Sequence, residues 1–259
     1  MDIFDTHVHF SEDSRKTQAT LERASAAGVS HLMAVGGSAE LNRAAIMAAE
    51  SANGSGLAPV VRLALGFDRD QAGAMCAECP RYDFSAIIDN RKRISAIGEI
   101  GLDFHYAPET AKDQCDLFAA QLELARELDL PVVIHTRDAD DATIGVLDET
   151  DFHNGIIHCF TGSVPFERKL LDRGFMISIS GIVTFRAADN VRDAARFVPD
   201  DRLLVETDSP FLAPVPKRGT ENEPSFIVHT LSFLSELRNM RPEALAVLTM
   251  DNAKRMLEC

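Results

Sequence analysis

Short apolar runs recur along the whole chain, and they alternate with segments whose apolar positions follow a helical period. The runs are rich in Val, Ile and Leu and are bounded by Gly, Pro, Asp or Asn, as is typical of buried parallel strands. Eight strands are predicted on this basis: Ile3–His9, His31–Val35, Val60–Leu65, Ala96–Ile100, Val132–His135, Ile156–His158, Phe175–Ser178 and Leu203–Glu206.

The segments between these runs carry the helical pattern. Leu117, Leu124 and Leu128 lie on one face of a predicted helix, and Pro131 ends it before the next strand. Further helices are predicted around Ala44–Ala48, over Val164–Arg173 and over Ala187–Phe197.

The order of strand and helix repeats about eight times in 259 residues. This length and order predict an α/β fold of the (β/α)8 TIM barrel type, which usually takes ~250 residues. A doubly wound open sheet is the structural alternative. No composition break or long linker divides the chain, so residues 1–259 are predicted to form a single domain.

Composition and charge restrict the possible partners. The chain carries 26 basic and 40 acidic residues, a net charge of -14, which excludes a broad basic surface for nucleic acid. A polyanionic substrate would therefore have to be held by a few Arg or Lys side chains or by bound cations. No obligate protein partner is evident from the sequence.

The cellular setting is predicted from features that the chain lacks. No apolar run reaches the ~18 residues of a membrane span, and the first residues carry no basic segment typical of a secretory signal. Five scattered cysteines favour a reducing compartment, so we expect a cytoplasmic protein with no membrane association. The spacing of Cys76 and Cys79 is read as chance, because no second such pair follows.

The first strand ends in the sequence His7-Val8-His9. Residues i and i+2 of a strand point to the same face, so both imidazoles would project into the barrel mouth. Two neutral imidazoles together form a ready site for a divalent metal. The alternative is a pair of unrelated histidines at a strand end.

Other predicted strands also end in residues that bind metals. These are Glu99, His135, His158 and Asp208. Catalytic residues of TIM barrels gather at the carboxyl-terminal face, so we expect all six side chains to converge there. Four imidazoles and two carboxylates suffice for two cations if one carboxylate bridges them.

Five motifs in this order resemble those of the TatD family of metal-dependent DNases. The resemblance runs from residue 5 to about residue 229. The motifs are His7-Val8-His9, Gly98-Glu99-Ile100-Gly101-Leu102-Asp103, Ile134-His135-Thr136-Arg137-Asp138-Ala139, His158-Cys159-Phe160-Thr161-Gly162 and Glu206-Thr207-Asp208-Ser209-Pro210.

This resemblance implies an amidohydrolase-like barrel with two divalent metal ions. Their identity stays open among Mg, Mn and Zn, and the family favours Mg or Mn for nuclease activity. The ligand sets that the resemblance implies are His7, His9 and Asp208 for one metal, and His135 and His158 for the other, with Glu99 as the bridge.

Two catalytic residues and two supporting residues are predicted around this centre. Asp208 would accept a proton from the attacking water, or would act only as a ligand, and Glu99 would hold both metals. Glu206 and Asp103 would orient metal ligands, or would instead cap the helices that follow them.

Two arginines are candidates for binding substrate. Arg137 directly follows His135, and its guanidinium would meet a phosphate at the barrel mouth; the alternative is a salt bridge to Asp138 or Asp140. Arg218 lies on the loop after the eighth strand, where barrel enzymes often bind phosphate. The alternative there is a solvated loop, because acidic residues follow closely.

The first functional hypothesis is a DNase that works as a 3′–5′-like exonuclease on single-stranded ends, because a deep barrel mouth admits a strand terminus. The second is a hydrolase of a small ester, lactone or amide with the same metal centre. Thr220, where the family has Lys, and the negative net charge favour this second hypothesis. The third is a non-catalytic metal-binding protein.

Overall fold

The computed structural model describes residues 1–55, 59–73 and 82–257 of the chain. Cys76 and Cys79 lie outside these residues. The described strands are β1 (Ile3–Val8), β2 (Val29–Gly37), β3 (Val60–Phe67), β4 (Ala96–Asp103), β5 (Val132–Arg137), β6 (Gly155–Ile157), β7 (Met176–Ile179) and β8 (Leu203–Val205).

Helices alternate with these strands. The α-helices are α1 (Ser14–Ala26), α2 (Ala39–Ser55), α3 (Ser85–Asp89), α4 (Ala111–Leu128), α5 (Asp140–Thr150), α6 (Val164–Asp172), α7 (Asp189–Phe197), α8 (Ile227–Leu237) and α9 (Pro242–Leu257). Short 3-10 helices are η1 (Arg69–Gln71), η2 (Pro108–Thr110), η3 (Gly181–Thr184), η4 (Asp200–Arg202) and η5 (Pro224–Phe226).

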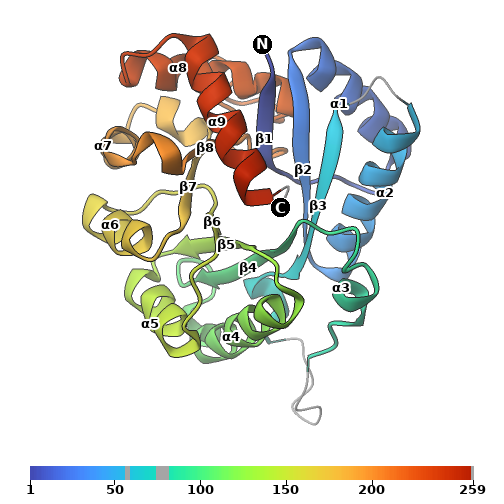
Figure 1. Cartoon of the computed structure of the whole chain (residues 1–259), viewed down its shortest axis with the longest axis vertical. Helices are drawn as coiled ribbons and strands as arrows, with labels where there is room; N and C mark the ends of the chain where they lie inside the picture. The colour runs from blue at the N-terminus through green and yellow to red at the C-terminus, as the bar shows by residue number, and fades with distance from the viewer. Residues whose placement is uncertain (56–58, 74–81, 258–259) are drawn as a thin grey trace.

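The strands form one parallel sheet in the order of the sequence, from β1 to β8, in the part of the chain that the structure describes. The sheet curves round until Val8 pairs with Ser209, just after β8, and His9 N–H donates to the Ser209 carbonyl over 2.8 Å. Helices surround the sheet in Figure 1. The predicted (β/α)8 barrel is therefore confirmed, and the open-sheet alternative is wrong.

Apolar side chains fill the barrel at the amino-terminal ends of its strands. Phe4, Ala96 and Met176 lie among them, and Met250 and Leu257 of α9 pack against the same cluster. Figure 1 shows α9 lying across this end of the barrel. Because α9 closes the amino-terminal end, the carboxyl-terminal end is left for a functional site.

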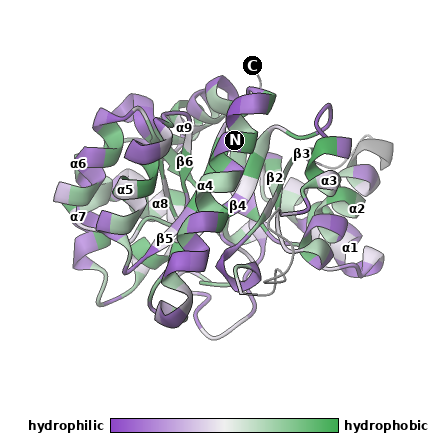
Figure 2. Ribbon diagram, turned by 90° about the horizontal axis from the view of Figure 1, so that it is seen from below, coloured by the Kyte–Doolittle hydropathy of each residue, from purple (hydrophilic) through white to green (hydrophobic). Residues whose placement is uncertain are grey.

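The surrounding helices bury one face each. Figure 2 shows apolar residues on the strands and on the helix faces that meet them, with polar residues on the outside. Helix α4 shows the pattern well, because Leu117, Leu124 and Ala125 are buried and Arg126 is exposed. All eight predicted strands and all four predicted helices are present, with ends that differ by a few residues. In the described residues, no helix combines the length and apolar character needed to cross a membrane.

One buried carboxylate outside the barrel mouth makes stability depend on pH. Glu167 of α6 is fully buried, and neither carboxylate oxygen has a hydrogen-bond partner among the described residues. Burial raises the pKa of Glu167 from 4.5 to about 8, and the charge of Arg238 opposes this rise only in part. The folded protein therefore pays an increasing cost of ionisation as the pH rises from about 4.5 to about 8.

We expect Glu167→Gln to be more stable than the wild type above pH 8 by a few kcal/mol, since each pKa unit corresponds to about 1.4 kcal/mol. Below pH 4.5 the two proteins should differ little, because the carboxyl is then protonated in both states. Urea unfolding across this pH range measures the difference. Glu127→Gln, at an exposed position of α4, is the matched control. A difference that does not change with pH would contradict the prediction.

Candidate metal centre

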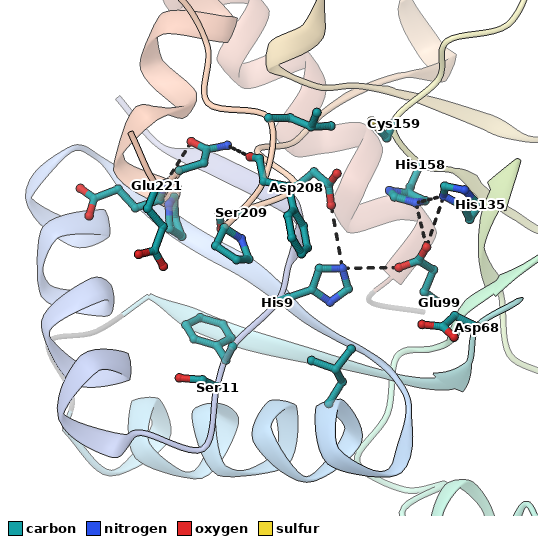
Figure 3. A pocket seen from close by; sticks show the side chains of 18 of the residues that line it. His9, Ser11, Asp68, Glu99, His135, His158, Cys159, Asp208, Ser209 and Glu221 are labelled. Atoms are coloured by element: carbon teal, nitrogen blue, oxygen red, sulfur yellow. Dashed lines mark hydrogen bonds and ion pairs between the residues drawn. The ribbon is translucent and has the colours of Figure 1, made fainter. Parts of the chain in front are cut away.

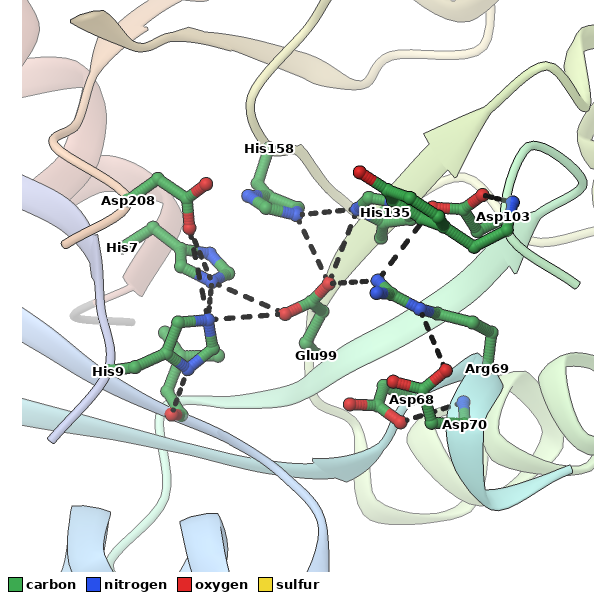
Figure 4. Close-up of polar contacts among 12 residues, drawn as sticks. His7, His9, Asp68, Arg69, Asp70, Glu99, Asp103, His135, His158 and Asp208 are labelled. Carbon is green, nitrogen blue, oxygen red and sulfur yellow. Dashed lines mark hydrogen bonds and ion pairs between the residues drawn. The ribbon is translucent and has the colours of Figure 1, made fainter. Parts of the chain in front are cut away.

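Six side chains meet at the carboxyl-terminal mouth of the barrel (Figure 4). They come from β1, β4 and β5 and from the residues that directly follow β1, β6 and β8. These are the six that the sequence singled out: His7, His9, Glu99, His135, His158 and Asp208. Strands β6 and β8 each end one residue earlier than predicted, so His158 follows β6 instead of closing it, and Asp208 lies on the loop after β8 as predicted.

The carboxylate of Glu99 lies at the middle of the cluster. Its Oε2 lies 3.6 Å from Nε2 of His7 and 3.4 Å from Nε2 of His9. Its Oε1 lies 3.3 Å from Nδ1 of His135 and 3.4 Å from Nε2 of His158. The two oxygens of one carboxylate thus face two different pairs of imidazole nitrogens.

Asp208 completes the group on the side of β1. Its Oδ1 lies 3.8 Å from Nε2 of His9 and 4.0 Å from Nε2 of His7, and these two nitrogens are 3.1 Å apart. Ligand atoms of His7, His9 and Asp208 all lie within 4.8 Å of one another, as do those of His7, Glu99 and His158. His135 joins the second set through its contact of 3.2 Å with His158.

The tautomers of two histidines are set by carboxylates behind them. Nε2 of His135 contacts Oδ2 of Asp103 at 3.0 Å, and Nδ1 of His158 contacts Oε1 of Glu206 at 3.3 Å. A carboxylate accepts a hydrogen bond from the ring N–H that faces it, so the other nitrogen of a neutral ring presents its lone pair. Both lone pairs then point toward Glu99.

His9 is oriented in the same way by the backbone. Its Nδ1 lies 3.0 Å from the carbonyl oxygen of Val35, which can only accept a hydrogen bond. Nε2 of the neutral ring therefore faces Glu99 and Asp208 with its lone pair. Three imidazoles and two carboxylates that all aim electron pairs at a common space form a donor set that fits divalent cations.

Electrostatics of the cluster agree with a cation-binding role. Burial, reinforced by the charge of His158, lowers the pKa of His7 to about 3, so this ring is neutral at pH 7 as a ligand must be. Burial opposes protonation of His158, but without a cation Glu99 and Glu206 outweigh burial and hold the pKa of His158 well above its usual value. Burial opposes ionisation of Glu99, but this charge on His158 and hydrogen bonds from the protonated ring nitrogens hold the pKa of Glu99 well below its usual value. A bound cation would take the place of these protons, and the lone pairs of the rings would then serve as ligands. Burial also raises the pKa of Asp208 to about 7.

Local backbone features place Glu99 in this position. The pairing of β4 with β5 shifts register between Gly98 and Ile100, so Glu99 sits at an irregularity of the kind that redirects side chains near active sites. A Cβ at Gly98 would lie 2.6 Å from the side chain of Val133. Only glycine allows this close approach of the two strands.

A buried carboxylate that sequence reasoning missed ties β1 to the loop after β8. Oδ1 of Asp5 accepts from the backbone N–H of Thr207 over 2.9 Å, and Oδ2 accepts from its hydroxyl over 2.6 Å. The backbone N–H of Asp208 donates to the carbonyl of His7 over 3.0 Å. These contacts fix Asp208 against the His7-Val8-His9 segment.

Glu206 and Asp103, the residues predicted to orient metal ligands, both contact histidines of the cluster. Glu206 is fully buried and contacts His158 and the backbone N–H of Cys159, the latter at 2.7 Å. Asp103 both contacts His135 and accepts from the backbone N–H groups of His105 and Tyr106, so it also organises the turn after β4.

The two arginine candidates lie in different surroundings. Arg137 lines the mouth, and its guanidinium lies over the ring of Tyr106 at 4.8 Å from the centroid; the described residues show no salt bridge to Asp138 or Asp140. Arg218 instead stacks on the ring of Phe185 at 3.9 Å and does not line the cavity. The stacking turns its guanidinium into the loop, so no contact supports the substrate role predicted for it.

A cavity of about 840 Å³ opens above the cluster, and Figure 3 shows the side chains that line it. Asp68 and Arg69 also line it, although sequence reasoning did not single them out. The reason is that the third strand was predicted to end at Leu65, whereas β3 continues to Phe67. Both residues therefore directly follow the carboxyl end of a strand.

Comparisons with known proteins agree with the barrel fold and with a metal-dependent hydrolase. The sequence matches the model of the TatD related DNase family over residues 4–258. It is 35% identical to the "uncharacterized metal-dependent hydrolase YabD" of Bacillus subtilis, with 98% of each chain covered. It is 49% identical to the "uncharacterized metal-dependent hydrolase YcfH" of Escherichia coli K12 over 63% of this chain, and that match spans only 62% of YcfH.

Among solved structures, the chain resembles YjjV, a TatD homologue of Escherichia coli K12. The TM-score is 0.83 at 28% sequence identity, with 99% of this chain and 98% of YjjV covered. A TatD family hydrolase of Entamoeba histolytica has the same fold, with a TM-score of 0.85 at 18% identity over 98% of this chain and 97% of that one. Because the family match extends over nearly the whole sequence, the chain belongs to the TatD related DNase family.

Proposed function

We propose that this protein is a metal-dependent hydrolase that cleaves phosphodiester bonds of DNA. The observation that carries the proposal is the position of Glu99, whose two carboxylate oxygens face separate pairs of imidazole nitrogens at 3.3–3.6 Å. A carboxylate in this position would be able to serve as a ligand together with both pairs of imidazoles. The relatives named as metal-dependent hydrolases support the reaction class.

The proposed ligands are His7, His9 and Asp208 for one cation, and His135 and His158 for the second, with Glu99 between them. When bound, the two cations would lower the pKa of a water and neutralise charge on the phosphoryl oxygens. The mixture of imidazole and carboxylate groups admits Mg, Mn or Zn.

The protein's own groups would then perform three tasks. Asp208 accepts a proton from the attacking water, a role for which a buried carboxyl with a raised pKa is suited. Glu99 links the group formed by His7, His9 and Asp208 to the pair formed by His135 and His158. Asp103 and Glu206 keep the rings of His135 and His158 turned toward the reacting atoms.

The cavity mouth supports a single-stranded end as substrate. Phe211 and Tyr106 both line it and are 59% and 65% exposed, so each offers a ring on which a base can stack. The guanidinium of Arg137 lies over Tyr106 and adds a positive charge beside that ring. A site at the bottom of a barrel mouth accepts a strand terminus more readily than the interior of a duplex, which favours exonuclease action.

Oligonucleotides labelled at the 3′ or the 5′ end provide the test. With Mg or Mn present, we expect the wild type to shorten single strands stepwise, and the labelled end that is lost first gives the polarity. Duplexes with blunt ends should react about 5- to 30-fold more slowly, since opening a terminal pair costs ~1–2 kcal/mol of stacking. Absence of any shortening with Mg, Mn or Zn would refute the proposed nuclease.

A small neutral ester or lactone is the second candidate substrate. Two basic side chains of α1 at the cavity are already paired: Lys16 lies 2.5 Å from Glu221, and Arg23 lies 2.7 Å from Glu223. These pairs reduce the positive charge available to a polyanion at one side of the mouth. Turnover of a lactone or ester panel without cleavage of oligonucleotides would favour this candidate, and bound metal without any turnover would indicate a non-catalytic protein.

A further inference from the structure

Arg69 lies on the cavity wall beside the metal cluster, on the side of Glu99 that faces His135 (Figure 4). Its Nη1 is 3.9 Å from Oε1 of Glu99 and 3.9 Å from Oδ2 of Asp103. The guanidinium therefore stands next to the proposed bridging ligand and next to the carboxylate that orients His135. Neither contact is short enough to be a hydrogen bond.

The backbone holds this arginine firmly. Arg69 is the first residue of η1, and the side chain of Asp68 caps that turn by accepting from the N–H of Asp70 over 2.9 Å. The N–H of Asp68 itself donates to the carbonyl of Gly37 at the end of β2 over 2.7 Å. These contacts fix the position from which the Arg69 side chain extends into the cavity.

The guanidinium of Arg69 makes ion-pair contacts with Asp70, Glu99 and Asp103 but no hydrogen bond with any residue that the structure describes. Its Nε is buried, with only an ion-pair contact of 3.4 Å to Asp70 among those residues. A buried donor without a hydrogen-bond partner is costly, and native structures retain such groups chiefly for a reason. A guanidinium whose donors lack hydrogen-bond partners, at a cavity that holds metal ligands, suits a planar or tetrahedral oxyanion.

We propose that Arg69 binds a nonbridging oxygen of the substrate phosphate and makes the site selective for phosphate esters that carry negative charge over neutral esters. This inference rests on the proposed phosphodiester hydrolysis and specifies its substrate class. A phosphodiester presents two nonbridging oxygens that share one charge, so one can face the metal centre while the other reaches Arg69. A carboxylic ester or lactone has no second anionic oxygen for the guanidinium to bind.

Two substrates with the same leaving group test the selectivity: bis(p-nitrophenyl) phosphate, which is anionic, and its neutral methyl triester. In Arg69→Met we expect kcat/KM for the diester to fall about 100-fold, as for loss of a charged hydrogen-bond donor in an active site. The triester should change less than about threefold. Arg69→Lys should recover part of the diester activity, because it keeps the charge but loses the fork of donors.

Binding of inorganic phosphate to the metal-loaded protein, measured by titration calorimetry, decides the inference without turnover. We expect Arg69→Met to raise the Kd for phosphate about tenfold. The metal content of the variant, measured by mass spectrometry, should be unchanged. Arg196→Met is the matched control, because Arg196 pairs with Asp193 on the exposed side of α7.

Equal losses on diester and triester would show that Arg69 only balances the charges of Glu99 and Asp103, and would overturn the inference. If the wild type cleaves no phosphodiester at all, the proposed function is wrong. The binding of inorganic phosphate then remains as the test of whether Arg69 binds an oxyanion. A Kd that depends on Arg69 would then still support an oxyanion site. A Kd unaffected by Arg69→Met would overturn it in either case.

Discussion

Glu99→Gln is expected to lower hydrolytic activity at least about 10³-fold, equivalent to ~4 kcal/mol of transition-state stabilisation. The amide that replaces the carboxylate carries no charge, and its NH2 group would face one of the two imidazole pairs with hydrogens instead of a lone pair. One half of the cluster therefore loses its oxygen ligand. Activity assays, together with metal analysis by mass spectrometry, measure both consequences, and we expect bound metal to fall by about one equivalent or more.

Glu221→Gln is the matched control for this variant. Glu221 lines the same cavity, but its carboxylate is paired with Lys16 at the outer rim and is half exposed. We expect at most about a fivefold loss of activity, because an exposed ion pair contributes at most ~1 kcal/mol and the variant removes no positive charge from the cavity. Full activity and full metal content in Glu99→Gln would show that the six residues do not form the proposed centre.

Asp208→Asn is expected to reduce kcat by about 10²–10⁴-fold, the usual contribution of a general base. The amide keeps the shape of the side chain and one oxygen that can face His7 and His9. Substrate binding should therefore change little, and the loss should appear in kcat instead of KM. Steady-state kinetics at saturating metal separate the two quantities.

The alternative role of Asp208, as a ligand only, gives a different result. If added metal restores the activity of Asp208→Asn to near the wild-type level, then Asp208 serves to hold the cation and another group accepts the proton. Asp138→Asn provides the control, because Asp138 is exposed and contacts His105 at 2.9 Å. That variant should keep its activity.

The sequence determined the architecture with few errors. Runs such as Val132–His135 combine strand-forming residues with clear boundaries, and local propensity and burial agree there. The strand ends are predicted less accurately: β4 continues past its predicted end at Ile100 to Asp103, and β3 continues past its predicted end at Leu65 to Phe67. Backbone pairing with neighbouring strands sets these ends, and pairing partners lie far away in the sequence.

The six candidate ligands could also be found from the sequence, and the physical reason is the period of a strand. His7 and His9 share a face because side chains alternate, and the carboxyl ends of parallel strands meet at one rim. A residue that follows the carboxyl end of a strand therefore lies at the mouth of the barrel. The same rule applies to Arg69, which was missed only because the end of its strand was misjudged.

Only the tertiary structure decided how these groups face one another. The orientation of His135 depends on Asp103, and that of His158 depends on Glu206, 48 positions later in the chain. Arg218 was expected at the substrate, yet it stacks on Phe185 because the long loop after β8 packs against η3. Local sequence fixes which strand carries a side chain, whereas ring orientation and loop packing follow from contacts between distant segments, which no short pattern contains.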